Sequence, residues 1–210
     1  MIMIMSRQNN ITSTRKNNDN YNNTILDNNN DNVNKKTKVL YGTQSSTKAL
    51  VEFVSRAKQK IDSVIDSKAP SVIIEVESIR KERFAAAKDR SVKLRYVTEI
   101  TNDNLSYCKE MLKFSEIRHL DGVKGNFEVS DIKEYVADTT LQSANKQPMP
   151  QLIYSNVKEV VEQQQYVFDT LWSRAIPSEQ KIREIEYGII PEITEVIQVL
   201  KRQKEESGIF

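Results

Sequence analysis

The sequence has very few of the residues on which most enzymes depend. Its 210 residues include one cysteine, Cys108, one histidine, His119, and five scattered glycines. A single cysteine cannot form an internal disulfide, so nothing indicates secretion. No cysteine and histidine cluster has the spacing of a zinc site, and no glycine-rich loop could bind phosphate. We therefore expect neither a metal nor a cofactor.

Long hydrophobic runs are missing as well. The apolar start, MIMIMS, is short and lacks the basic region of a signal peptide. No segment approaches the roughly 20 apolar residues that a membrane-spanning helix requires. We therefore expect no membrane insertion and a cytoplasmic location.

Charge of one sign is not in excess either. The chain has 31 lysines and arginines against 29 aspartates and glutamates, which gives a net charge of +2. Because a dedicated nucleic-acid surface needs a concentrated excess of basic residues, we expect no nucleic-acid partner. The basic run at residues 80–83 is interpreted as a solvated helix face, with a nucleic-acid contact as the alternative.

Residues 1–37 are predicted to form a disordered tail. Twelve of the first 34 residues are asparagine, and almost no apolar positions repeat. Such a segment buries too little surface to offset its chain entropy. An adhesive role for the asparagine-rich tract is the alternative. Ordered structure is expected from Lys38 onward.

Helix and strand patterns alternate through residues 38–176. Apolar residues recur at helical spacing in three segments, and strand patterns lie between them at residues 61–66, 92–100 and 116–120. Two short alternating segments, residues 126–130 and 133–137, predict a hairpin. This order predicts an α/β fold with a mixed, largely parallel sheet flanked by helices. The polar residues 139–151, which contain two prolines, are predicted to be a loop.

Long helices are predicted at the C-terminal end. The first spans residues 156–175 and carries Trp172, which we interpret as a packing anchor. Residues 177–210 are predicted to be a helical linker or stalk, because apolar residues repeat at heptad-like spacing at Ile182, Ile185, Ile189, Ile193, Val196 and Leu200. Such a stalk would join two chains in a homodimer. The equally open alternative is a helix folded back on its own domain.

The single histidine restricts the catalytic options. A mechanism that pairs serine or cysteine with histidine needs the nucleophile and an orienting acid beside the imidazole. His119 lies in a strand pattern between Arg118 and Leu120, and no catalytic motif surrounds it. We therefore interpret His119 as a structural residue at a strand end.

The strand and hairpin motifs carry a resemblance to a known family. The path from Leu50 through KLRYVTEI (residues 93–100) to EIRHLDGVKGNFEVSDIKEY (residues 116–135) resembles one half of the phospholipase D superfamily. The family signature H-x-K-x4-D falls on Lys124, Asn126 and Asp131, so of the three residues only the aspartate is kept. The following small-residue motif corresponds to residues 137–140 and is also altered.

The resemblance implies that the chain is not an enzyme. The family's chemistry depends on a histidine that attacks phosphorus, and that position holds Lys124, while Asn126 replaces the catalytic lysine. A lysine that is cationic at neutral pH is a poor nucleophile. The alternative is a residual phosphodiesterase whose active site forms between two protomers and uses His119.

A longer resemblance covers residues 39–188. The phrases VKLRYVTEITNDNLSYCKE, EIRHLDGVKGNF and IYSNVKEVVEQQQYVFDTLWSRAIPSEQKIREIE are similar to the input domain of archaeal sensor histidine kinases. That domain is related to the sugar-sensing domain of TrmB-type regulators. The resemblance implies a signal-sensing module of a two-component system, with a histidine kinase or response regulator as partner. No kinase core follows in the chain, so we expect a stand-alone or split sensor. The sensor part of a TrmB-like transcription regulator is the alternative.

The resemblance also implies where a ligand would bind. The family cleft lies at the ends of the sheet strands, where α/β folds generally hold ligands. The expected binding residues there are Glu99, Arg118, His119, Lys124, Asn126 and Asp131. Lys124 and Arg118 would hold an anion, and Asn126 a hydroxyl or an amide. The alternative is that Lys124 and Asp131 pair with each other at a surface turn.

Overall fold

The structure is a computed structural model that describes residues 35–143, 146–188 and 203. Most of the predicted tail, and the part of the predicted stalk beyond residue 188, lie outside the described residues. The elements of the described chain, in order, are β1 (Thr37–Tyr41), α1 (Thr43–Arg56), β2 (Lys60–Val64), α2 (Ala69–Glu75), α3 (Glu77–Lys88), β3 (Lys93–Thr98), α4 (Leu105–Met111), β4 (Glu116–His119), β5 (Asn126–Ser130), β6 (Glu134–Ser143), β7 (Lys146–Ser155), α5 (Lys158–Arg174), β8 (Ile176–Pro177) and α6 (Ser178–Tyr187).

The strands form one sheet in the order β1-β7-β6-β5-β2-β3-β4-β8. Among the described strands, β2–β3 and β3–β4 are parallel, and the other five neighbouring pairs are antiparallel. The α/β class and the mixed sheet are confirmed, but the expectation of a largely parallel sheet is wrong. The alternation of helix and strand correctly indicates parallel pairing among β2, β3 and β4. The remaining strands, β1, β5, β6, β7 and β8, join the sheet by antiparallel pairing.

The segment predicted to be a loop, residues 139–151, belongs largely to the strands β6 and β7. Thr140 of β6 lies opposite Pro150 of β7, and β1 pairs with β7 from Gln151 onward. The carbonyl of Pro150 points to the β1 side, where it accepts the N–H of Gly42 at 2.8 Å. The missing N–H of the proline therefore faces away from β6 and removes no hydrogen bond of that pair. The polar composition and the prolines of residues 139–151 therefore led to the wrong prediction of a loop.

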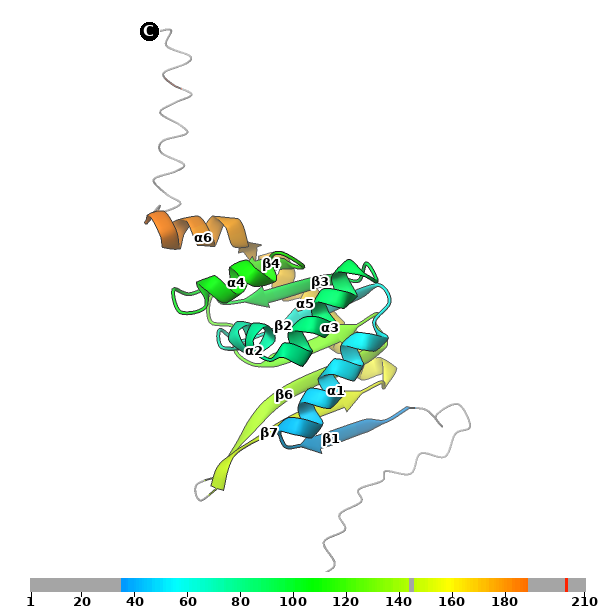
Figure 1. Cartoon of the computed structure of the whole chain (residues 1–210). Helices are drawn as coiled ribbons and strands as arrows, with labels where there is room; N and C mark the ends of the chain where they lie inside the picture. The colour runs from blue at the N-terminus through cyan, green and yellow to red at the C-terminus, as the bar shows by residue number, and fades with distance from the viewer. Residues whose placement is uncertain (1–34, 144–145, 189–202, 204–210) are drawn as a thin grey trace, which may run out of the picture. The chain divides into compact units, whose positions relative to one another are not determined.

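Helices cover both faces of the sheet (Figure 1). The helices α1, α2, α3 and α4 lie over one face, where they form the main core with residues such as Ile61 and Tyr96 of the strands. The helix α5 covers the opposite face, where Phe168 packs against Val64 and Val97 in a smaller cluster. Successive strand residues alternate between the two faces, so each inner strand serves both cores.

The beginning of the predicted stalk packs on the domain itself. The boundary expected between residues 176 and 177 falls inside β8, which pairs with the edge strand β4. In α6, which follows directly, Ile182 is buried and Ile185 packs against the main core. This arrangement matches the alternative of a helix folded back on its own domain, for residues 178–187 alone.

Four polar side chains form a buried network in the main core. Arg83 of α3 and Glu128 of β5 are 1% and 6% exposed, and the guanidinium donates to both carboxylate oxygens at 2.9 and 2.6 Å. Arg83 also donates to the hydroxyl of Tyr96, and Ser63 donates to Glu128, each at 2.9 Å. Burial alone would lower the pKa of Arg83, but the charge of Glu128 raises it. The guanidinium therefore stays protonated, and its ion pair joins α3 to the sheet.

Replacing Arg83 by methionine should lower the free energy of unfolding by about 3–5 kcal/mol, because Glu128 would remain as an unpaired buried charge. Urea denaturation followed by circular dichroism measures the change. The matched control on the same helix is Lys81→Met, which removes an exposed ion pair with Glu77 and should cost less than about 1 kcal/mol. If both substitutions lowered the free energy of unfolding equally, the buried Arg83–Glu128 pair would contribute no more to stability than an exposed ion pair.

Candidate functional site

The carboxyl ends of β2, β3 and β4 meet at one edge of the sheet, because these strands are parallel. Glu99 follows β3, and His119 is the last residue of β4. The antiparallel strand β5 brings its first residue, Asn126, to the same edge, with Lys124 just before it. Four of the six predicted binding residues therefore share this edge.

Asp131 lies at the opposite end of β5 and holds the start of β2. Its carboxylate accepts the backbone N–H groups of Lys58, Gln59 and Lys60 at 2.8, 2.9 and 2.9 Å. Burial would raise the pKa of Asp131, but these three hydrogen bonds outweigh it and hold the pKa below its ordinary value. The partners are backbone amides rather than Lys124, so the alternative of a Lys124–Asp131 pair is not what the structure contains. Asp131 does not join the other predicted residues.

Asn126 holds the turn that follows β2. Its side-chain oxygen accepts the backbone N–H of Asp66 at 2.9 Å, and its side-chain nitrogen donates to the Asp66 carboxylate at 3.1 Å. The same carboxylate also accepts the N–H groups of Lys68 and Ala69, at 2.9 and 3.0 Å, at the start of α2. Asn126 and Asp66 therefore act together to position α2 against the strand end.

Asp138 completes a group of acidic residues that sequence analysis missed. It lies directly opposite Asn126 in the β5–β6 register. Asp138 is exposed at the surface, yet loss of part of its hydration, together with the negative charges of Glu128 and Asp66, raises the pKa of Asp138 to about 6. We call Asp66, Asn126, Glu128 and Asp138 the strand-end site. The register between β5 and β6, which places Asp138 opposite Asn126, was the information missing from the sequence.

His119 has a structural environment. The side chain is 3% exposed, its Nδ1 accepts the N–H of Ile100 at 2.9 Å, and Nε2 lies 3.0 Å from a carboxylate oxygen of Asp121. Since Nδ1 is an acceptor, the proton sits on Nε2 and is donated to Asp121. Burial lowers the pKa of His119 despite the nearby Asp121 charge, which favours the neutral ring. Both ring nitrogens therefore already take part in hydrogen bonds within the protein.

Arg118 points to the other face of the sheet. It donates to the backbone carbonyl of Trp172 at 3.1 Å, and its guanidinium lies 4.3 Å from the centre of the indole. Arg95 lies 5.0 Å from the centre of the same ring and binds Asp62 through two hydrogen bonds of 2.7 and 2.9 Å. Stacking on Trp172 therefore holds Arg118 against α5, away from the strand-end site.

The last two predicted residues, Glu99 and Lys124, lie at the strand ends without a common partner. The side chain of Lys124 is exposed, and that of Glu99 is half-buried. The backbone carbonyl of Glu99 accepts a hydrogen bond of 2.9 Å from Asn104, whose amide also donates to the carbonyl of Ser67 at 2.8 Å. Asn104, which sequence analysis missed, therefore fastens the loops after β2 and β3 to each other.

The part of the chain that the structure describes contains neither a candidate metal-binding cluster nor a candidate membrane-spanning helix. No group of three or more histidine, cysteine, aspartate or glutamate side chains there is arranged to hold a metal ion. Within the same residues, none of the helices combines the length and the apolar character needed to cross a membrane.

The substitution Asp138→Asn should stabilise the protein at neutral pH and have little effect near pH 4. The native pKa of about 6 lies above the ordinary 3.8, so the folded state binds the proton more tightly and loses stability as pH rises between these values. The difference in unfolding free energy between variant and wild type, measured in urea, should grow from about pH 4 to about pH 7. Asp103→Asn, at an exposed loop position, is the control. Parallel curves for both variants would contradict the raised pKa.

Comparisons with known proteins support the fold but provide no family. No family model and no curated protein matches the sequence. The solved structures include TrmBL2, described as an archaeal chromatin protein with a novel mode of DNA binding. The two chains are 19% identical with a TM-score of 0.50, over 67% of this chain and 54% of TrmBL2. The chain thus spans about half the length of TrmBL2.

Two bacterial proteins have the same fold over nearly their whole length. Nuc from Salmonella typhimurium, a phospholipase D family member, is 14% identical with a TM-score of 0.54, over 68% of this chain and 97% of Nuc. NucT from Helicobacter pylori is 12% identical with the same TM-score of 0.54, over 68% of this chain and 99% of NucT. At these identities the likeness is one of fold. The described domain therefore has a phospholipase D-like fold, which it shares with TrmBL2.

Proposed function

We propose that the described domain is a non-catalytic sensor module, the ligand-binding part of a signalling or regulatory protein. The observation that carries this proposal is the use made of Asn126, at the position of the family's catalytic lysine. Both ends of its amide hold Asp66, so the side chain supports the turn after β2. Lys124, at the position of the catalytic histidine, is exposed. A lysine ammonium group is a poor nucleophile.

The charge of the strand-end site also favours binding of a ligand over hydrolysis of a phosphodiester. The carboxylates of Asp66, Glu128 and Asp138 are close enough for the first two to raise the pKa of the third. The positive charge of Arg83 is already used by Glu128 in two hydrogen bonds. A phosphodiester is an anion and would be repelled by the remaining carboxylates.

A neutral, hydroxyl-rich molecule such as a sugar is the ligand class that fits these groups. Ionised carboxylates accept hydrogen bonds from hydroxyl groups, and a protonated carboxyl also donates one. Asp138, with a pKa of about 6, is present in both forms slightly below neutral pH. The resemblance to the sugar-sensing domain of TrmB-type regulators points to the same ligand class.

The signal would leave the domain through α6. This helix follows β8, which pairs with β4, and Glu186 of α6 forms an ion pair with Lys109 of α4. A ligand shifts only an equilibrium between states that it binds differently. We propose that it changes the position of α6 and the chain beyond it. A homodimer through C-terminal helices and a histidine kinase or response-regulator partner in the cytoplasm remain parts of this proposal.

A DNA-contacting regulator is the second candidate. TrmBL2, which has the same fold, is described as a chromatin protein with a novel mode of DNA binding. The balance of 31 basic and 29 acidic residues argues against such a role for this chain by itself. A salt-sensitive mobility shift with duplex DNA would favour this second candidate.

Calorimetric titration of the full chain with a panel of mono- and disaccharides tests the sensor proposal. At least one sugar should bind saturably, and Asp138→Asn should weaken it about tenfold, equivalent to about 1.4 kcal/mol. Affinity that depends on the ionised carboxylate should also fall as the pH drops through about 6. Asp103→Asn, outside the site, should leave the affinity unchanged.

Two results would count against the proposal. Absence of binding across the panel, or equal losses in Asp138→Asn and Asp103→Asn, would remove the strand-end site as the sensor. Hydrolysis of bis(4-nitrophenyl) phosphate that disappears in His119→Ala, with the circular dichroism spectrum unchanged, would instead establish a phosphodiesterase.

A further inference from the structure

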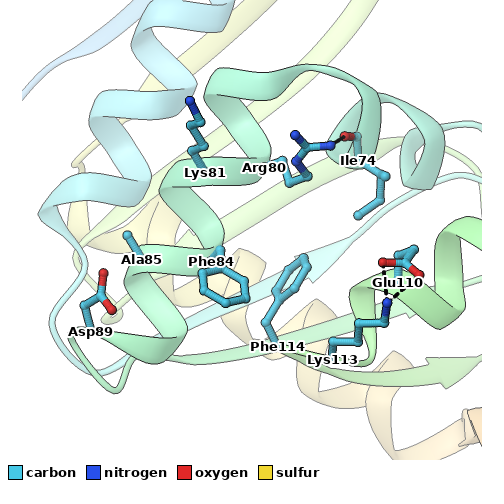
Figure 2. Close-up of a pocket in the computed structure, with 9 residues that line it drawn as sticks. All are labelled: Ile74, Arg80, Lys81, Phe84, Ala85, Asp89, Glu110, Lys113 and Phe114. Carbon is cyan, nitrogen blue, oxygen red and sulfur yellow. Dashed lines mark hydrogen bonds and ion pairs between the residues drawn. The ribbon is translucent and has the colours of Figure 1, made fainter.

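A second candidate site lies on the outer side of the helical layer, between α3 and α4. There the surface has a hollow of about 350 Å³, within the usual range for small-molecule sites. None of its lining residues belongs to the strand-end site. We call it the α3–α4 hollow; it is lined by Ile74, Arg80, Lys81, Phe84, Ala85, Asp89, Glu110, Lys113 and Phe114 (Figure 2).

Two aromatic rings form the centre of the hollow. Phe84 of α3 and Phe114, just after α4, point toward each other with ring centres 6.2 Å apart and planes at 69°. Phe114 is nearly buried, but Phe84 is 49% exposed. Much of the Phe84 ring therefore faces water, although its edge-to-face contact with Phe114 holds it in place. An exposed and oriented ring of this kind is suited to contact a flat apolar group.

The charged residues around the rings are not equivalent. Lys113 binds Glu110 at 2.6 Å, and Lys81 binds Glu77 at 2.7 Å, so each of these lysines already has a carboxylate partner. Arg80 is different, because its Nη1 donates a hydrogen bond of 3.2 Å to a backbone carbonyl, that of Ile74, rather than to a carboxylate. Glu77 lies near enough to be influenced by the Arg80 charge, but its hydrogen bond is to Lys81.

The hydrogen bond to Ile74 orients the Arg80 guanidinium at the rim of the hollow (Figure 2). A guanidinium has five N–H donors in a planar fork, so one bond to a carbonyl leaves donors for a bidentate contact with a carboxylate. The rim thus combines an oriented cation with the aromatic floor of Phe84 and Phe114.

We propose that the α3–α4 hollow binds a small aromatic carboxylate. The ring of the ligand packs on Phe84 and against Phe114, and its carboxylate accepts hydrogen bonds from Arg80. A carboxylate suits this position because the other two cations of the lining already have acidic partners. The proposal concerns a site separate from the one in the proposed function, and each can fail without the other.

Titration of the full chain with 4-phenylbutyrate, followed by calorimetry, tests this site. Binding should be saturable with one site per chain, and both Phe84→Ala and Arg80→Gln should weaken it about tenfold or more. Arg80→Lys should bind less well than wild type, because a lysine keeps the charge but lacks the planar fork. Lys48→Gln on α1 is the matched control for loss of one exposed cation and should have no effect.

The neutral analogue 4-phenylbutan-1-ol and the aliphatic acid octanoate separate the two parts of the ligand. Both should bind more weakly than 4-phenylbutyrate, the first for lack of charge and the second for lack of a ring. Binding that is unchanged in Arg80→Gln and Phe84→Ala, or absent altogether, would overturn the proposal. Binding of an acidic, phenylalanine-containing peptide in place of 4-phenylbutyrate would also overturn it. Asp138→Asn should bind 4-phenylbutyrate normally, which keeps this result independent of the strand-end site.

Discussion

The buried ion pair between Arg83 and Glu128 is the constraint on which the arrangement of the strand ends depends. Its bidentate hydrogen bonds join α3 to β5 inside the main core. A buried pair of this kind is costly to break, because either partner alone would be an unpaired charge. The position of β5 is therefore closely defined. Asn126, two residues before Glu128, is held beside Asp66, and Asp138 is held opposite Asn126 by the strand register.

The strand β5 fastens its neighbour β2 at both ends, through Asp131 at the start and Asn126 at the turn that follows. Asp131 and Asn126 thus hold the backbone at the beginning of β2 and in the turn after it. The region of α4 links the loops at the strand ends to α6. Asn104 just before it ties the loops after β2 and β3 together, and Lys109 within it contacts α6. The helix α4 and the residue before it thus contact both the loops at the strand ends and α6.

Local patterns predicted the inner elements well, because each depends on residues close in sequence. The strand at residues 92–100 and the helix at residues 156–175 appear as β3 and α5 with small changes at their ends. The loop expected at residues 139–151 was wrong, since the backbone of Pro150 faces the β1 side and leaves the β6–β7 pairing intact. Of the predicted binding residues, Glu99, His119, Lys124 and Asn126 do reach the strand-end edge. Arg118 does not, because it stacks on Trp172 of the opposite face.

The sequence by itself determined the α/β class and the alternation of helix and strand through β4. These follow from residue identity and from periodicity, which are local properties. The tertiary structure alone decided the antiparallel majority of the sheet, the Arg83–Glu128 pair and the proximity of Asp138 to the charges of Asp66 and Glu128. Each of these joins residues far apart in the chain, and their pairing depends on strand register and on packing across the core. The same is true of the α3–α4 hollow, where two helices bring Phe84 and Phe114 together.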